Sequence, residues 1–109
     1  MTAVEKALLL LARKSRTELE LDSALERARF SPEDRKSALA RMRELGYIDD
    51  RELARQRARS LLERGKKPWF VARKLAAQGV PREEARAAAA QVAAELGVAW
   101  EGDDIIEDE

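Results

Sequence analysis

Basic side chains are concentrated in the middle of this sequence. Between Arg51 and Lys74 there are nine basic residues, and only Glu52 and Glu63 are acidic. Arginine and lysine at this density favour contact with phosphate or carboxylate groups, because their charges add to one positive field. The candidate binding residues are Arg51, Arg55, Arg59, Arg64, Lys66, Lys67, Arg73 and Lys74. The stretch therefore predicts a surface for an anionic partner.

Two groups within this stretch differ in their spacing. Arg51, Arg55 and Arg59 recur every fourth residue, so on a helix they form one stripe in which neighbouring charges repel each other. Such a stripe is either a binding face or a solvated face relieved by nearby acids. The basic residues around Gly65 are instead gathered at a glycine turn, where a loop presents its side chains to solvent. We expect this second group to carry more of the binding.

Aromatic residues are few, and Phe70 stands directly among the basic ones. An exposed ring at this place is a candidate anchor, which can stack on a base or hold a protein contact. The alternative, and the commoner case for aromatics in small domains, is that Phe70 packs on the first or the fourth helix. For Tyr47 we expect a place in the core.

Asp49 and Asp50 are adjacent carboxylates at the predicted start of a helix. They either cap that helix and compensate its dipole, or form a metal or acid/base pair. The sequence has no His and no Cys, which removes the commonest general base, the commonest metal ligand and thiolate chemistry. Capping by Asp49 is the favoured interpretation. The sequence predicts neither an enzyme nor a bound metal or other cofactor.

The charge of the chain is unevenly distributed. Residues 101–109 hold six acids and no base, and without them 21 basic residues face 15 acidic ones. This acidic tail either keeps the protein soluble or folds back on the basic stretch and competes with an anionic partner. The longest apolar run near the start, Ala7 to Ala12, is too short to span a membrane. We expect a cytoplasmic monomer without a membrane partner.

The spacing of apolar residues predicts six helices and no strand. Their expected ranges are about 3–14, 17–28, 31–45, 50–64, 68–79 and 81–96. Thr17 and Glu20 are spaced as a capping box, and Ser31 before Pro32 is typical of a helix start. The residues expected on the inner faces of the first three helices are Val4, Ala7, Leu8, Leu11, Ala12, Leu21, Ala24, Leu25, Ala28, Ala38, Leu39, Met42 and Leu45, with Leu9 and Leu10 widening the first face so that it packs on two sides. Those expected for the fourth helix are Leu53, Ala54, Ala58, Leu61 and Leu62. We expect the stem of Arg57 to be partly packed and Phe30 to fill the corner after the second helix.

The second half of the chain repeats the first after a shift of fifty residues. The matched pairs are Leu11 and Leu61, Leu21 and Val71, Leu25 and Leu75, Phe30 and Val80, Ala38 and Ala88 and, after one further residue of shift, Gly46 and Gly97. The sequence predicts an all-α protein with two tandem three-helix repeats at 1–48 and 49–97, in an elongated, right-handed array. The acidic tail at 98–109 is expected to be mostly disordered.

Four segments of the sequence form a combination that resembles a known family. They are the run from Leu10 to Lys14, Arg16-Thr17 with Glu20-Leu21, the run from Leu45 to Ala54 with Gly46, Tyr47, Asp49 and Asp50, and Glu63-Arg64-Gly65-Lys66 with Pro68. Together they resemble RecX, the bacterial regulator of the RecA recombinase, over residues 7–97. The resemblance implies binding to RecA filaments on DNA, single- or double-stranded. It also implies inhibition of the ATPase, strand-exchange and coprotease functions of RecA in DNA repair and the SOS response.

The sequence departs from the RecX pattern at several places. RecX proteins usually carry a third repeat, whose place is taken here by the acidic tail. A second lysine, Lys67, stands where the family tends to have glycine, and Trp69 and Phe70 stand where it tends to have a basic pair. Ala28-Arg29 replaces the usual Lys-Gly, so a differently built corner before Phe30 is expected.

Two other classes of function remain open from the sequence. One is a general helical DNA-binding protein, although no helix carries the Asn, Gln and Arg set suited to reading base edges. The other is an interaction scaffold without nucleic acid, anchored by Trp69, Phe70 and Trp100. A general DNA-binding protein would prefer bare duplex DNA over RecA-coated strands. An interaction scaffold would keep its partner bound after charge reversal at Arg64, Lys66 and Lys67.

Overall fold

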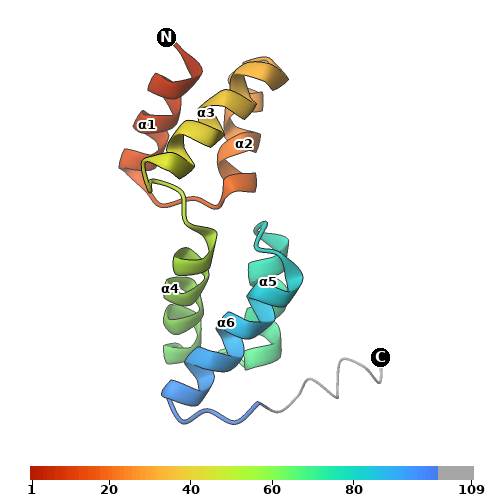
Figure 1. The fold of residues 1–109 in the computed structure, drawn as a ribbon. Coiled ribbons are helices and arrows are strands. Elements are labelled where there is room, and N and C mark those ends of the chain that lie inside the picture. The colour runs from red at the N-terminus through yellow and green to blue at the C-terminus, as the bar shows by residue number, and fades with distance from the viewer. Residues whose placement is uncertain (101–109) are drawn as a thin grey trace. The chain divides into compact units, whose positions relative to one another are not determined.

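The computed structural model describes residues 1–100, which form six helices and no strand. The helices are α1 (Ala3–Arg13), α2 (Glu18–Arg27), α3 (Pro32–Glu44), α4 (Asp50–Glu63), α5 (Pro68–Ala77) and α6 (Arg82–Glu95), as labelled in Figure 1. The predicted all-α class and the order of the helices are confirmed. The acidic residues expected in the tail, 101–109, lie outside the described residues.

The chain divides into two compact units, each with its own hydrophobic cluster. Unit 1 is Met1–Asp50 and contains α1, α2, α3 and the first residue of α4. Unit 2 is Arg51–Glu109, of which residues 51–100 are described, and it contains the rest of α4, α5 and α6. The two clusters share no residue. The fold is therefore best understood one unit at a time.

Every helix of unit 1 begins with a hydrogen-bonded side-chain cap. Thr17 and Glu20 form the predicted capping box at α2, and Ser31 caps α3 as predicted. Thr2 and Glu5 form a second capping box at α1, which was not predicted from the sequence. There the backbone and side-chain hydrogen bonds with Thr2 lower the pKa of the Glu5 carboxyl.

The core of unit 1 forms where α3 packs against both α1 and α2 (Figure 1). Leu21, Leu25 and Met42 are its largest fully buried side chains. Phe30, at the corner between α2 and α3, packs against this cluster, as expected. Long aliphatic side chains thus fill this unit.

The predicted inner face of α1 is partly wrong. Ala7 is buried, but Leu8 and Leu9 are 40% and 50% exposed, and Ala12 is exposed as well. The expected packing of this helix on two sides is therefore wrong within the described residues. A run of consecutive leucines lies on all sides of a helix, so it cannot indicate which side meets the core. Ala28, at the end of α2, is also exposed rather than buried.

The expected burial of Leu45 and Tyr47 is also wrong. They are 45% and 55% exposed, whereas Ile48 is 6% exposed and belongs to the core of unit 1. The chain leaves α3 through Gly46, whose φ of 78° is left-handed. Because α3 ends before this turn, the helical spacing of buried residues no longer applies from Leu45 onward. Ile48 rather than Leu45 therefore packs into the core.

The corner between α2 and α3 is built like its counterpart in unit 2. Arg29 adopts a left-handed φ of 72°, and Gly79, fifty residues later, has a φ of 106°. Both corners therefore pass through a left-handed residue, an arginine in unit 1 and a glycine in unit 2. Because an L-residue pays a steric penalty in this region, Arg29 occupies a position better suited to glycine.

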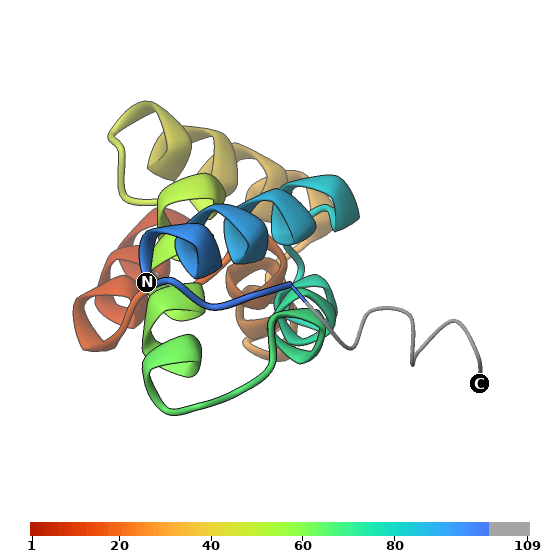
Figure 2. The ribbon, with the colours of Figure 1, turned by 90° about the horizontal axis from the view of Figure 1, so that it is seen from below.

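Unit 2 is packed with smaller side chains than unit 1. α5 and α6 lie side by side (Figures 1 and 2). The alanines of α6 at 85, 89 and 93 are buried in one cluster with apolar residues of α4 and α5. All five predicted inner residues of α4 are buried: Leu53, Ala54, Ala58, Leu61 and Leu62. Trp100, assigned to the tail from the sequence, packs partly buried against this cluster, and Arg86 lies 5.1 Å from its ring centre.

Equivalent backbone hydrogen bonds close the helix ends in the two units. The pairs are Phe30 N to Leu25 O (3.2 Å) with Val80 N to Leu75 O (3.1 Å), and Tyr47 N to Met42 O (2.9 Å) with Val98 N to Ala93 O (2.8 Å). The first pair is related by a shift of fifty residues and the second by fifty-one, the same shifts that align the apolar positions. The sequence repeat is therefore also a repeat of local structure.

Candidate anion-binding surface

A left-handed glycine shapes the turn between α4 and α5. Gly65 has a φ of 88°, its N–H donates to Leu62 O (2.9 Å), and the N–H of Lys66 donates to Leu61 O (3.0 Å). These bonds end α4, and the buried Pro68 starts α5 with its ring at the first helical position. The turn therefore has one defined course, and its basic side chains extend from it into solvent.

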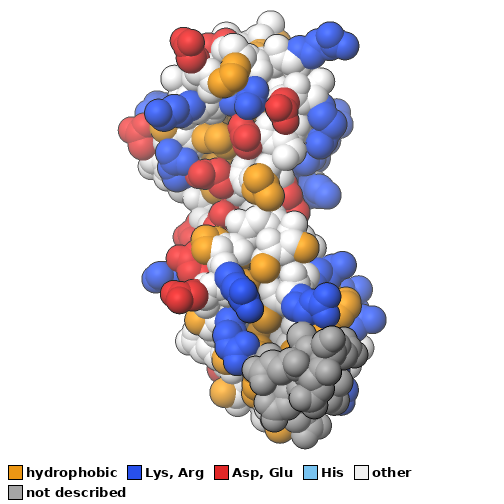
Figure 3. Space-filling model, turned by 90° about the vertical axis from the view of Figure 1, so that its right-hand side faces the viewer, with side chains coloured by type: hydrophobic (Ala, Val, Ile, Leu, Met, Phe, Trp, Pro, Cys, Tyr) orange, Lys and Arg blue, Asp and Glu red, His pale blue; other side chains and the backbone are white. Residues whose placement is uncertain are grey.

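The basic turn, which we define as Arg64, Lys66 and Lys67, carries unneutralised charge. All three residues are exposed. Among the residues that the structure describes, none of the three forms an ion pair. Arg73 and Lys74 on α5 are likewise exposed and make no ion pair there. Lys and Arg side chains on this unit are visible in Figure 3, with apolar side chains between them.

Two aromatic rings interleave with these cations. Phe70 is 36% exposed, and the Nζ atoms of Lys66 and Lys74 lie 5.7 and 6.0 Å from its ring centre. Trp69 meets Phe70 edge-on at 6.2 Å, and the guanidinium carbon of Arg73 lies 5.9 Å from the Trp69 ring centre. Phe70 therefore keeps part of its side chain in solvent beside the two lysines. Cation–π contacts hold the lysines over the ring without neutralising them.

The start of α5 lacks the cap found fifty residues earlier. Lys67 stands at the N-cap position and makes no side-chain cap hydrogen bond. At the matching place in unit 1, Thr17 and Glu20 form a complete capping box. A cap of this kind stabilises a helix by about 1 kcal/mol. Unit 2 therefore has Lys67 and Phe70 at positions where the fold would be more stable with a hydroxyl and a carboxylate.

The arginine stripe of α4 faces the end and start of α6. Arg55 Nη2 lies 3.3 Å from Glu95 Oε2, Arg59 pairs with the other oxygen of Glu95, and Arg51 lies 4.0 Å from Glu84. These carboxylates were not predicted as partners, because they follow more than thirty residues later in the sequence. The repulsion along the stripe is thus relieved within unit 2. Within residues 1–100, three of the eight predicted residues have carboxylate partners and five have none.

Arg57 and Gln78, which the sequence analysis did not place together, link α4 to α5. Arg57 is partly buried, as predicted, and its Nη1 donates to Gln78 Oε1 at 2.9 Å. Residues 21 positions apart leave no local sequence signal for such a bond. It brings a further guanidinium to the side of α4 that faces Lys74.

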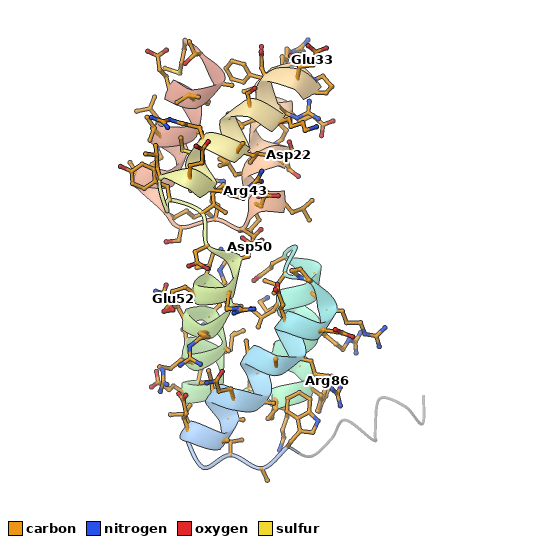
Figure 4. The ribbon with its side chains drawn as sticks, in the orientation of Figure 1. Asp22, Glu33, Arg43, Asp50, Glu52 and Arg86 are labelled. Carbon is orange, nitrogen blue, oxygen red and sulfur yellow. The ribbon has the colours of Figure 1, made fainter. Side chains whose placement is uncertain are left out.

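Asp50, the first residue of α4, holds a structural position. Asp50 Oδ1 accepts a hydrogen bond of 2.9 Å from the backbone N–H of Glu18, the first residue of α2 (Figure 4 labels Asp50). Glu18 in turn pairs with Arg43 of α3. Asp50 therefore satisfies a backbone donor at the N-terminus of α2. Within the described residues no group of three or more acidic side chains is arranged to hold a metal ion.

The fold and the basic surface define an all-α helical-repeat protein with a cationic face on its second repeat. Neither a protein-family model nor a curated protein matches the sequence. Among solved structures, the crystal structure of RecX from Lactobacillus salivarius matches with a TM-score of 0.80 at 20% identity. The match covers 86% of this chain and 62% of that chain. The chain has a RecX-like fold and spans less than two thirds of the length of that RecX. No described helix is both long and apolar enough to cross a membrane.

Proposed function

We propose that this protein is a regulatory protein that binds RecA–DNA filaments and inhibits the ATPase, strand-exchange and coprotease activities of RecA. One observation carries the proposal: a RecX-like fold presents exposed basic and aromatic side chains on its second unit. A filament of RecA on DNA offers phosphates and acidic side chains, so it is a partner that such a surface can bind. The proposed role is regulatory binding rather than catalysis, in the cytoplasm.

The basic turn is the part of unit 2 that we propose to contact the filament. Its three cations have no carboxylate partner among the described residues, so binding an anionic partner breaks no internal ion pair there. Arg55 and Arg59 would first have to leave Glu95. The order of contributions that we propose is therefore the basic turn first, Arg73 and Lys74 next, and the arginine stripe last.

The test is ATP hydrolysis by RecA on single-stranded DNA. Saturating protein should lower the hydrolysis rate, and the triple variant R64Q/K66Q/K67Q should need at least tenfold more protein for the same effect. The matched control removes one Arg and two Lys from exposed positions of unit 1: K14Q/R27Q/K36Q. An unchanged rate at saturation would defeat the proposal. Equal loss in the two triple variants would remove the basic turn from it.

A second candidate function is DNA binding without RecA. The exposed ring of Phe70 between two lysines favours it, because aromatic rings flanked by cations stack on unpaired bases. Filter binding separates the candidates by comparing bare duplex, bare single strands and RecA-coated single strands. Preference for the coated strand supports the filament regulator, and preference for bare DNA supports the second candidate.

A further inference from the structure

A hollow with a mixed polar and apolar lining opens between α4 and α5 in unit 2. Its volume is about 220 Å³, and it is lined by Arg57, Ser60, Leu61, Arg64, Lys74 and Gln78. Three of these six side chains are cationic and none is acidic. At about 30 Å³ for each water of the liquid, the hollow has space for roughly seven waters. A five-atom phosphate group and part of its hydration shell therefore fit.

The cations approach the hollow from both helices. Arg57 and Arg64 are seven residues apart, two helical turns along the same side of α4 and its end. Lys74 and Gln78 are four residues apart on α5. The bond from Arg57 Nη1 to Gln78 Oε1 (2.9 Å) fixes one guanidinium at the wall. Arg64 and Lys74 have no ion pair among the residues described.

The corresponding positions of unit 1 show that the fold does not need this lining. Fifty residues earlier stand Ala7, Leu10, Leu11, Lys14, Ala24 and Ala28. Only the leucine at 11 and 61 and one cation, at 14 and 64, are common to both sets. Alanine and leucine therefore occupy most of these positions in the matching helix pair of unit 1. The like charges of Arg64 and Lys74 at one hollow repel each other, and an anion placed between them relieves that repulsion.

We propose that this hollow binds one phosphodiester group of a single-stranded nucleic acid, with an adjacent base stacked on Phe70. Lys74 connects the two parts, because it lines the hollow and its Nζ lies 6.0 Å from the centre of the Phe70 ring. Guanidinium groups match the geometry of phosphate oxygens, and the Ser60 hydroxyl can donate to a third oxygen. The inference deepens the proposed function and depends on it for the choice of nucleic acid over free phosphate.

The first experiment is an NMR titration of the full-length protein without RecA. The Nε–Hε signals of Arg57 and Arg64 are followed during addition of four probes: inorganic phosphate, dT8, an abasic deoxyribose-phosphate octamer and octaglutamate. All three phosphate probes should shift these two signals, and only dT8 should also shift the ring signals of Phe70. Equal shifts of arginines throughout the protein would overturn the proposal. Stronger binding of octaglutamate than of the abasic octamer would assign the hollow to an acidic protein instead.

The second experiment measures the affinity for dT8 against salt concentration. R64Q/K74Q should weaken binding at least tenfold and lower the salt slope by about 0.7 for each phosphate that the variant no longer binds. It should leave the melting temperature unchanged or higher, because repulsion is relieved. The matched control R27Q/K36Q removes the same charges from exposed positions of unit 1, and the charge-conserving R64K/K74R should retain most of the binding. Equal affinities of R64Q/K74Q and R27Q/K36Q would overturn the proposal.

The experiments on the hollow and those on RecA regulation can each overturn their own proposal without the other. Inhibition of RecA without specific binding of phosphate in the hollow would overturn the further inference and leave the regulator intact. Specific phosphate and base contacts without any effect on RecA would support the hollow and overturn the regulator. If R64Q/K74Q does not fold, the charge-conserving R64K/K74R is compared with K74Q, which removes one charge. Binding of dT8 that is no tighter for folded R64K/K74R than for K74Q would count against the hollow.

Discussion

The two units begin their second helix with different chemistry. In unit 1, the backbone N–H of Glu20 donates to Thr17 Oγ1, and the backbone N–H of Thr17 donates to Glu20 Oε1. In unit 2, Lys67 and Phe70 stand at the same places, and no side chain caps α5. The same backbone thus carries a stabilising pair in one copy and an exposed cation and ring in the other. A repeat protein can keep one copy for stability while the other copy carries binding residues at some loss of stability.

The two units also differ in how they connect neighbouring helices. In unit 1, Arg35 Nε lies 2.9 Å from Asp22 Oδ1, and its Nη1 donates to the carbonyl of Phe30 at 3.0 Å. The equivalent positions in unit 2, 85 and 72, are both alanine. There the close packing of small side chains takes the place of the ion pair.

The largest effects are expected from truncating one core at a time. Leu25→Ala and Leu75→Ala each remove a fully buried side chain and should cost about 3 kcal/mol of unfolding free energy. Hydrogen exchange followed by mass spectrometry should show faster exchange mainly in the unit that carries the substitution. Equal acceleration in both units from either variant would contradict two separate cores.

Breaking the ion pair between Arg35 and Asp22, whose matching positions in unit 2 are both alanine, should give the next largest effect. Arg35→Met leaves Asp22 and the Phe30 carbonyl without this donor, so urea denaturation should show a loss of about 2 kcal/mol. Arg41→Met on the exposed side of α3 is the matched control and should change stability by less than about 0.5 kcal/mol. Equal losses would show that the contacts of Arg35 do not stabilise the unit.

Exchanging residues at the two left-handed corners should give smaller, opposite effects. Arg29→Gly removes a steric penalty and should stabilise the protein by about 0.5 kcal/mol. Gly79→Ala introduces that penalty at a φ of 106° and should destabilise it by about 1 kcal/mol. Thermal denaturation measures both. If Arg29→Gly does not stabilise the protein and Gly79→Ala does not destabilise it, the two corners are not equivalent.

The capping box of α1 should give the smallest effect, which depends on pH. Hydrogen bonds with Thr2 lower the pKa of Glu5 in the folded protein. The ionised carboxylate therefore stabilises α1 above the ordinary Glu pKa, and this contribution disappears as the pH falls through the lowered folded value. The helical signal of Glu5→Gln should be less sensitive to acid than that of the unchanged protein. Identical acid titrations of the two would contradict the box.

Much of the fold could be predicted from the sequence because its signals are local. Ser31-Pro32, the Thr17 and Glu20 pair and the glycines after the helices each act within a few residues. The inner face of α4 could be predicted because polar residues separate its apolar ones. The face of α1 could not, since four consecutive leucines fit any orientation.

Much of the candidate site could not be predicted, because its partners are distant in the sequence. The pairing of Arg55 and Arg59 with Glu95 depends on how α6 packs against α4. Likewise the hollow needs α4 and α5 together, so Arg57 was predicted only as a partly packed side chain. Composition indicated where positive charge lies, and only the packed helices show which cations have carboxylate partners.

The most direct test gives unit 2 the helix cap of unit 1. In K67T/F70E the unfolding free energy, from urea denaturation, and the affinity for RecA-coated single-stranded DNA are measured on the same preparation. We predict a gain in stability of about 1 kcal/mol together with at least tenfold weaker filament binding. A more stable variant that binds the filament as tightly as the unchanged protein would contradict the claim that Lys67 and Phe70 serve binding.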